Sequence, residues 1–277
     1  MTVAMAGGRV VITTGANSGL GLATAIAVAR AGFDSVGSVR SAAKARQVRA
    51  AAAAAGVEVR TVLLDVREAA ACARVIGRLR PWAVVNNAGF PASGAIEDVD
   101  DAAARAAFET MVLAPIRLAR LALPEMRARG EGRIVNMSSV YGLTTTPMTG
   151  WYQACKHALE ALSDALRVET AAFGVKVVLV EPGGFDTGIW DQAGSEIEGR
   201  AGSPYATAYA RVRSGIDLGR PLMGHPGGVA RVVVRALQAR RPSPRYLVGH
   251  DARAIAIYHS VVPAGVKDRL ARLALGL

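Results

Sequence analysis

The chain has 277 residues, of which 51% are apolar and 20% charged, a balance that suits one α/β domain with a substantial core and excludes intrinsic disorder. No apolar run approaches the roughly 18 residues that a membrane helix needs. Two cysteines are too few for a disulfide framework. We therefore expect a single cytoplasmic domain over residues 1–277. The net charge of +11 invites a nucleic-acid partner, but the arginines are scattered and no binding motif accompanies them, so we expect neither a nucleic-acid partner nor a metal site.

Strand-like and helix-like segments alternate along the chain. The expected strands are short runs rich in Val, Ile and Leu, at residues 10–14, 35–39, 57–64, 82–86, 133–138, 175–181 and 246–248. The expected helices lie between them, at residues 19–31, 41–55 (with Ser41 as the cap), 68–79, 102–129, 151–173 and 227–240. This order predicts a single-domain, doubly wound (Rossmann-type) parallel sheet with helices on both faces. Ligands bind such sheets at the carboxyl ends of the strands, where every motif below is expected.

A glycine-rich turn follows the first expected strand and opens the first helix. It reads Thr14-Gly15-Ala16-Asn17-Ser18-Gly19-Leu20-Gly21. Glycines let the backbone turn tightly and approach a pyrophosphate, and the helix N-terminus supplies N–H donors. The turn therefore predicts a dinucleotide site that includes Gly15, Asn17, Ser18, Gly19, Leu20 and Gly21.

The end of the second expected strand indicates which dinucleotide is bound. Sites that prefer NAD place an acidic residue there to bind the ribose 2′-OH, but this chain has Val39 followed by Arg40. Asp34 lies at the wrong end of the strand to substitute. A guanidinium can pair with a 2′-phosphate, so Arg40 predicts NADP(H), unless it is only a solvated loop residue.

Two further strand ends contribute to the predicted cofactor site. Asp65 ends the third strand, where its carboxylate could accept a hydrogen bond from an adenine amino group, and its neighbour Val66 is included in the site. The fourth strand ends in Asn86-Asn87-Ala88-Gly89, whose small residues let the backbone lie beside the adenosine ribose. Either segment could equally serve local turn chemistry, since Asp and Asn bond to nearby backbone.

Tyr152 and Lys156 are four residues apart on one expected helix, so they share a face. A tyrosine ionises at about pH 10, and a neighbouring ammonium is expected to lower that pKa. Such a tyrosine can exchange a proton with an alcohol or alkoxide. Ser139 follows the preceding strand, where its hydroxyl could hold the substrate oxygen, although Ser138 and Ser139 could also cap local backbone. We therefore predict Ser139, Tyr152 and Lys156 as the catalytic set.

Together with Pro182-Gly183 and Thr187, these motifs resemble the classical short-chain dehydrogenase/reductase family over about residues 8–190. The resemblance implies a tyrosine acid/base, a lysine that also holds the nicotinamide ribose, and a serine that orients the substrate. It places Tyr152, Lys156, Asn87, Ala88 and Gly89 in the cofactor site, with Pro182, Gly183, Phe185 and Thr187 near the nicotinamide. The stretch at residues 180–187 and the pair Val39-Arg40 are most similar to the hydroxysteroid and retinol dehydrogenase branch.

One residue departs from the family's pattern. The family usually places an asparagine in the helix after residues 86–89, but this chain reads Phe108-Glu109-Thr110-Met111-Val112. Methionine cannot hold the water that normally links the lysine to solvent, so the proton relay is in doubt. A redox-neutral epimerase or dehydratase and an inactive NADP(H)-binding regulator therefore remain as alternatives. The intact catalytic set favours an NADP-dependent ketoreductase or alcohol dehydrogenase.

Residues 188–225 are expected to form a substrate lid. Large apolar residues in this lid and beside the catalytic positions are candidates for contact with the substrate, which suggests a bulky apolar ketone or alcohol. These residues are Ile189, Trp190, Tyr205 and Met223 in the lid, and Tyr141, Met148 and Trp151 beside the catalytic positions. The tail at residues 250–277 carries one apolar helical stripe, formed by Val266, Leu270, Leu273, Ala274 and Leu277. We expect this stripe to pack or to form an oligomer contact in a homodimer or homotetramer, with contact to a membrane surface as the alternative.

Overall fold

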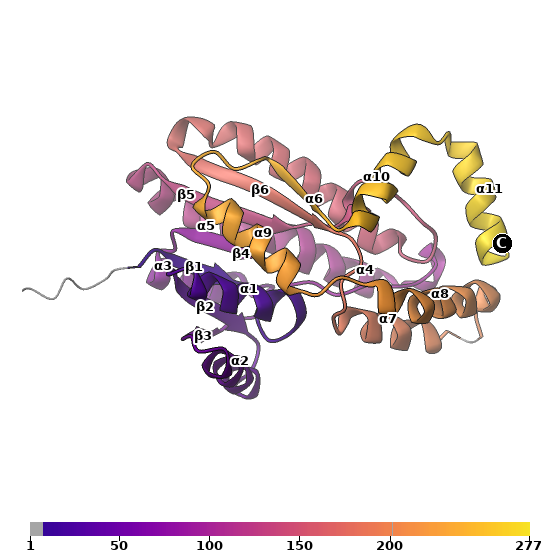
Figure 1. The fold of residues 1–277 in the computed structure, drawn as a ribbon, viewed down its shortest axis with the longest axis horizontal. Coiled ribbons are helices and arrows are strands. Elements are labelled where there is room, and N and C mark those ends of the chain that lie inside the picture. Colours follow the sequence, from indigo (N-terminus) through magenta and orange to yellow (C-terminus); the bar gives the residue numbers. More distant parts are fainter. Residues whose placement is uncertain (1–7, 201) are drawn as a thin grey trace, which may run out of the picture.

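A computed structural model describes residues 8–200 and 202–277, and within them seven parallel strands form one sheet (Figure 1). The strands are β1 (Val10–Thr13), β2 (Asp34–Val39), β3 (Arg60–Leu63), β4 (Ala83–Asn86), β5 (Gly132–Met137), β6 (Val175–Pro182) and β7 (Arg245–Val248). Their order is β3-β2-β1-β4-β5-β6-β7. The expected doubly wound α/β fold is confirmed.

The chain reverses its direction of travel across the sheet next to β1. Val11 pairs with Ser35 of β2 on one side and with Ala83 of β4 on the other. The loops that follow β1 and β4 therefore diverge to opposite sides. Such a switch point opens a crevice at the carboxyl ends of the strands, which is the general position of ligands in this architecture.

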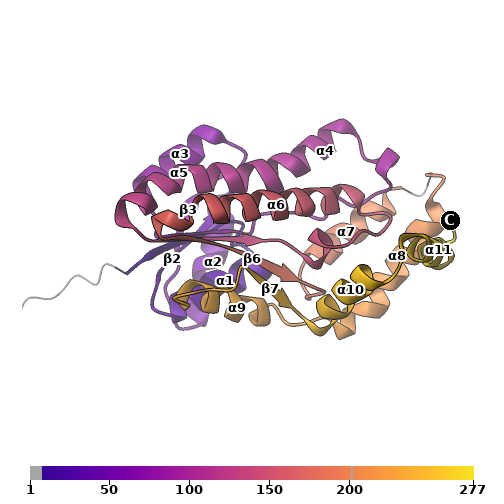
Figure 2. The ribbon, with the colours of Figure 1, turned by 90° about the horizontal axis from the view of Figure 1, so that it is seen from above.

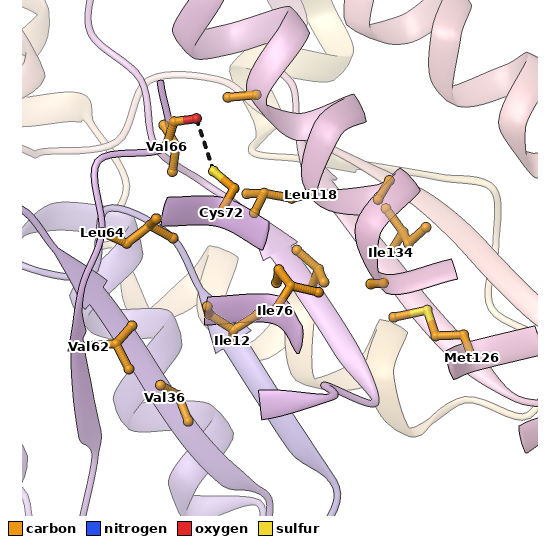
Figure 3. Packing of buried hydrophobic residues seen from close by; sticks show 14 of the residues in the cluster. Ile12, Val36, Val62, Leu64, Val66, Cys72, Ile76, Leu118, Met126 and Ile134 are labelled. Carbon is orange, nitrogen blue, oxygen red and sulfur yellow. Dashed lines mark hydrogen bonds between the residues drawn. The ribbon is translucent and has the colours of Figure 1, made fainter. Parts of the chain in front are cut away.

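Helices cover both faces of the sheet (Figure 2). Successive residues of a strand point to opposite faces, and here the residues on both faces are apolar and need to be covered. Ile12 faces the cluster under α3 (Ala69–Leu79) and α5 (Ala114–Arg129), part of which Figure 3 draws. Val11 faces the cluster under α1 (Gly19–Arg30) and α9 (Gly227–Gln238). The helix α2 (Ala42–Ala54) covers β2 and β3, and α6 (Gly150–Glu169) packs on β6. Both faces are apolar, so the central strands read as continuous runs of Val and Ile.

The long helix expected at residues 102–129 is interrupted. It consists of α4 (Asp101–Phe108), a π-helical turn (Glu109–Leu113) and α5. Pro115 has no N–H to donate to the carbonyl of Met111, so the regular ladder of hydrogen bonds cannot pass through this point. The interruption places Met111 on the wound-out turn, directly above the end of β4.

The second half of the chain adds helices at the carboxyl ends of the strands (Figures 1 and 2). The expected lid contains α7 (Ile189–Glu198) and α8 (Ala206–Gly219), and the tail forms α10 (His250–Val261) and α11 (Ala264–Leu275). Among residues 8–200 and 202–277, no helix is both long and apolar enough to cross a membrane.

Candidate active site

The glycine-rich turn after β1 has the backbone geometry of a close-approach site. Gly15 has a φ of +65°, a conformation that L side chains rarely adopt. A Cβ at Gly21 would collide with the carbonyl oxygen of Gly15, so α1 can begin this close to the turn only with glycine there. Ser18, the N-cap of α1, makes no capping hydrogen bond through its side chain with any described residue. This N-cap therefore leaves the N–H groups of the first turn of α1 without a side-chain acceptor, which fits a site for a pyrophosphate.

Thr14 and Asn87 hold the loops after β1 and β4 together. The Oγ1 of Thr14 accepts hydrogen bonds from the backbone N–H groups of Asn87 (2.9 Å) and Ala88 (3.0 Å). The Asn87 amide donates back to the Thr14 carbonyl at 2.9 Å. The predicted residues 87–89 thus lie beside Gly15 at the switch point. The sequence placed Thr14 in the glycine-rich turn without giving it a role, because its partners lie more than 70 residues away along the chain.

The adenosine end of the predicted site is more cationic than the sequence indicated. Arg40 follows β2 and is exposed, and Asp65 lies beyond the neighbouring strand β3. Arg67 binds both oxygens of Asp65 (Nη2 to Oδ2, 2.7 Å), and these hydrogen bonds lower the pKa of the Asp65 carboxyl despite its partial burial. Arg67 was not predicted, and it neutralises the nearest acidic group to Arg40.

Val66 contributes to this region only through its backbone. Its side chain is buried in the core, and its carbonyl accepts from the Cys72 thiol (3.3 Å, Figure 3) and from Arg117 (3.0 Å). Its buried side chain fixes the loop after β3. Any contact of Val66 with a cofactor would have to be made by its N–H.

The predicted catalytic residues come together at the end of β5. Ser139 directly follows Met137 and Ser138, and its Oγ accepts from the Tyr141 N–H (3.2 Å) and donates to the Pro182 carbonyl (3.4 Å). It thus also caps the short turn at Val140–Gly142, as the alternative interpretation of this serine anticipated. Lys156 is buried, and its Nζ lies 5.4 Å from the centre of the Tyr152 ring.

The pKa expected for Tyr152 is corrected by the structure. Burial raises the pKa of Tyr152 to about 12, and the nearby Ser139 hydroxyl opposes only part of this shift. The lowering expected from Lys156 is not seen, because its ammonium donates to the Met137 carbonyl at 2.7 Å and faces the ring rather than the hydroxyl. Burial lowers the pKa of Lys156 itself to about 8.

Met111 fills the space where a polar residue was expected to hold water. Its side chain is 1% exposed and belongs to an apolar cluster with Ala107 and Cys155, against which Tyr152 also packs. Its Sδ lies close beside Gly89, 3.4 Å from where a Cβ would stand. This packing gives Met111 a place in the apolar core and leaves no polar group of its side chain there to hold a water.

A buried polar chain runs beneath the catalytic residues and was not predicted. The Asn86 amide donates to Asn136 (2.8 Å), and Asn136 donates to Ser163 (2.8 Å). This chain ties β4 and β5 to α6, the helix that carries Tyr152 and Lys156. The unusual polar residue at each strand end was the signal for it.

A buried acidic pair lies one helical turn beyond Lys156. Glu160 of α6 and Glu181 of β6 share the guanidinium of Arg245, with a distance of 3.1 Å to each carboxylate. Burial and the charge of Glu160 raise the pKa of Glu181 well above its usual range, and Arg245 opposes the shift. The pair anchors β7 behind the catalytic helix.

The loop after β6 closes the predicted nicotinamide end. A Cβ at Gly19 would lie 3.1 Å from the Thr187 side chain, so this loop meets the glycine-rich turn. Pro182 ends β6, and Gly183 donates to Val248 of β7 at 2.9 Å. The Phe185 ring is buried in the core, and its carbonyl accepts from the Trp190 indole (2.8 Å). The structure therefore brings Thr187 to the crevice and turns Phe185 away from it.

The two helices of the expected lid, α7 and α8, are fastened to the loop after β4. The Tyr209 hydroxyl of α8 donates to Asp98 (2.6 Å) and accepts from the Ala95 N–H (2.7 Å). Glu196 of α7 accepts from the Ser93 N–H at 2.7 Å. Among the predicted substrate-facing residues, Tyr205 and Met148 pack into the apolar cluster around Tyr209. This network was not predicted, since its partners are about a hundred residues apart.

Comparison with known protein families matches residues 9–198 to the short chain dehydrogenase family. Among curated proteins, the chain is 33% identical to an uncharacterized oxidoreductase, YusZ, of Bacillus subtilis, over 92% of this chain and 94% of the relative. It is 30% identical to retinol dehydrogenase 16 of Mus musculus, over 95% of this chain and 87% of the relative.

Solved structures give the same picture. Actinorhodin polyketide ketoreductase with NADPH matches with a TM-score of 0.72 and 29% identity, over 87% of this chain and 95% of that one. A short chain dehydrogenase from Burkholderia phymatum in complex with NAD matches with a TM-score of 0.76 and 26% identity, over 91% and 93%. Both nicotinamide cofactors thus occur among structures similar to this chain.

Proposed function

Since the chain belongs to the short chain dehydrogenase family and is an oxidoreductase of that family, we propose that it transfers a hydride between NADP(H) and a carbonyl or secondary alcohol. The observation that carries the proposal is the meeting of Ser139, Tyr152 and Lys156 at the end of β5, beside the glycine-rich turn. A tyrosine proton, a serine hydroxyl and a fixed cation are the groups that carbonyl reduction requires.

The crevice fits a dinucleotide. Glycines stand where any side chain would block the approach to α1, and Thr187 faces Gly19 across the opening. We assign the pyrophosphate to residues 15–21 and the adenosine to Asp65, Val66 and residues 87–89. The nicotinamide end belongs to Lys156, Pro182, Gly183 and Thr187, with Phe185 supporting the loop from below. When bound, the cofactor supplies or accepts the hydride.

The chain's own residues handle the proton and the substrate oxygen. Ser139 holds that oxygen by a hydrogen bond, and Tyr152 donates its proton to the forming alkoxide, or accepts one in the oxidative direction. The raised pKa of Tyr152 keeps the proton on the hydroxyl at neutral pH, which suits donation. Lys156 keeps a buried positive charge beside the Tyr152 ring, 5.4 Å from its centre, while its ammonium is held on the Met137 carbonyl.

Arg40 supports NADP(H) over NAD(H). It is an exposed cation at the end of β2, where an NAD site would carry an acidic residue. The nearest carboxylate, Asp65, is already neutralised by Arg67. A doubly charged 2′-phosphate would therefore meet the Arg40 guanidinium, with the charge of Asp65 already compensated.

We propose a bulky apolar substrate beneath a lid of residues 188–225, within a single catalytic domain. The apolar cluster of Met148, Tyr205 and Tyr209 packs α8 of the lid against the loops after β4 and β5. The names of two similar proteins, a retinol dehydrogenase and a polyketide ketoreductase, point to substrates of this kind.

To test this proposal, the rate of NADPH oxidation is measured with each of a panel of apolar ketones. NADP⁺ reduction with the matching alcohols is measured in parallel. We expect turnover with a subset of the panel and the corresponding alcohol as product. NADPH binding without turnover would instead indicate a binding protein. An isomerised or dehydrated product with no net cofactor change would indicate redox-neutral chemistry.

A further inference from the structure

The two C-terminal helices form an arm beyond the carboxyl ends of the strands (Figure 1), and several of its large apolar residues are exposed. We call α10 and α11 the C-terminal arm. In α10, Ile257 and Val261 are 62% and 69% exposed, whereas Ala252 on the opposite side is buried. These two exposed residues are four apart, so they form one stripe along the helix.

The helix α11 repeats this arrangement. Leu270 and Leu273 are 48% and 67% exposed, and Val266 extends the same stripe by one turn, whereas Leu277 lies beyond the end of the helix at Gly276. The inward face is a different one: Leu275 packs against the apolar cluster of α8 around Tyr209. The stripe predicted from the sequence to pack against the protein or an oligomer partner is therefore not used for packing within the chain.

The outward face is flanked by positive charge. Arg253, Arg269 and Arg272 are exposed on the same two helices. The two carboxylates of the arm are Asp251, which turns inward to accept from the Gly184 N–H at 2.5 Å, and Asp268. An apolar stripe bordered by arginines is complementary to an anionic lipid surface. Two copies of this face would bring like charges together, on chains that each carry +11.

The arm is fixed to the borders of the active site. His259 hydrogen-bonds Thr144, in the loop between Ser139 and Tyr152, with 2.9 Å between Nδ1 and Oγ1. Arg211 of the lid helix α8 donates to the Leu273 carbonyl at 2.9 Å. Both views place the arm at the end of the sheet where the strands terminate (Figures 1 and 2). Whatever the outward face binds is held next to the lid.

We propose that this outward face, formed by Ile257, Val261, Val266, Leu270 and Leu273, docks the protein on the surface of an anionic lipid bilayer. The arm lies in the interface as an amphipathic pair of helices, with the arginines among the headgroups. This docking is independent of the proposed reaction, since it rests on residues outside the catalytic and cofactor sites.

The test is co-sedimentation of the full chain with vesicles, without cofactor or substrate. We expect binding to vesicles of equal parts phosphatidylcholine and phosphatidylglycerol, and weaker binding to phosphatidylcholine alone. The double variant Leu270→Glu/Leu273→Glu should lower the partition coefficient by about tenfold or more, because loss of one buried leucine already has that effect. Arg269→Gln/Arg272→Gln should reduce the preference for the anionic vesicles and its dependence on salt.

The matched control is Leu162→Glu/Val168→Glu, which adds the same two charges at residues of α6 that are 40% and 70% exposed and far from the arm in sequence. It should bind vesicles as the unmodified chain does, and thermal melts should show that all variants fold. Equal vesicle binding by the leucine variant and this control would overturn the proposal. So would the absence of vesicle binding by the unmodified chain. Gel filtration in which only the leucine variant loses an oligomer would assign the face to a second copy of the chain instead.

Discussion

The ammonium group of Lys156 donates a hydrogen bond to the main-chain carbonyl of Met137, with 2.7 Å between the two heavy atoms. The contact ties the catalytic helix α6 to the last residue of β5, two residues before Ser139. It also buries the ammonium, and this burial lowers the pKa of Lys156 to about 8.

The first prediction is a loss of activity at alkaline pH. Lys156 is protonated below about pH 8 and loses its charge above that value, so kcat/KM for ketone reduction should fall as pH rises through 8. Tyr152 does not cause this fall, because its own pKa lies near 12. The residual activity of Lys156→Arg should lack the alkaline fall, since a guanidinium stays charged. A wild-type profile that stays flat up to pH 10 would contradict the assignment.

Removing the Tyr152 hydroxyl separates proton transfer from binding. Tyr152→Phe should abolish turnover and leave NADPH affinity nearly unchanged, because only the transferable proton and its oxygen are lost. Fluorescence titration of NADPH and steady-state rates measure the two effects. If the variant keeps most of the wild-type rate, another group is the acid/base.

Arg40→Ala should discriminate between the two nicotinamide cofactors. A charge-assisted contact contributes about 1.5–3 kcal/mol, so NADPH should bind about ten- to hundredfold more weakly. NADH lacks the 2′-phosphate and should bind nearly as before. Dissociation constants for both cofactors, measured on both proteins, test this, and equal losses would rule out contact between Arg40 and the phosphate.

Met111→Asn tests whether this position is core or relay. The structure predicts a cost of about 1–3 kcal/mol for an amide without partners in an apolar cluster, and hence a lower melting temperature. The control is Met111→Leu, which keeps the volume and should melt close to the unmodified chain. The solvent deuterium isotope effect on turnover should be unchanged. A higher rate and a smaller isotope effect in Met111→Asn would support a relay role.

Glu181→Gln should change how stability depends on pH. The folded chain holds a proton on Glu181 at pH values where the unfolded chain, with a pKa of about 4.3, has lost it. The folded state thus binds more protons in this range, so the free energy of unfolding falls as pH rises from about 4 through neutrality. Glutamine cannot ionise and should flatten this slope. Denaturant unfolding at several pH values gives the comparison, and parallel slopes for both proteins would show that Glu181 is already ionised.

The fold was readable from the sequence because local signals agreed. Runs of Val and Ile bounded by glycines predicted the strands, and their alternation with helical segments implied a parallel sheet. The break at residues 109–113 was not foreseen, although Pro115 was visible. A proline near the start of a helix and a proline within one look alike until the neighbouring turns are known.

The order of strands, and with it the location of the active-site crevice, followed from the same alternation. Motifs at strand ends placed residues 15–21 and Tyr152 on one edge of the sheet, since parallel strands end together. Short-range spacing therefore determined which residues could carry the chemistry.

Only the tertiary structure decided the state of those residues. These states depend on the folded surroundings of each side chain. They include the direction of the Lys156 ammonium, the pairing of Arg67 with Asp65 and the burial of Met111. The same holds for the tail, whose apolar stripe was visible in the sequence but whose outward orientation was not. Periodicity shows that a helix has an apolar face, whereas packing against the rest of the chain determines what that face meets.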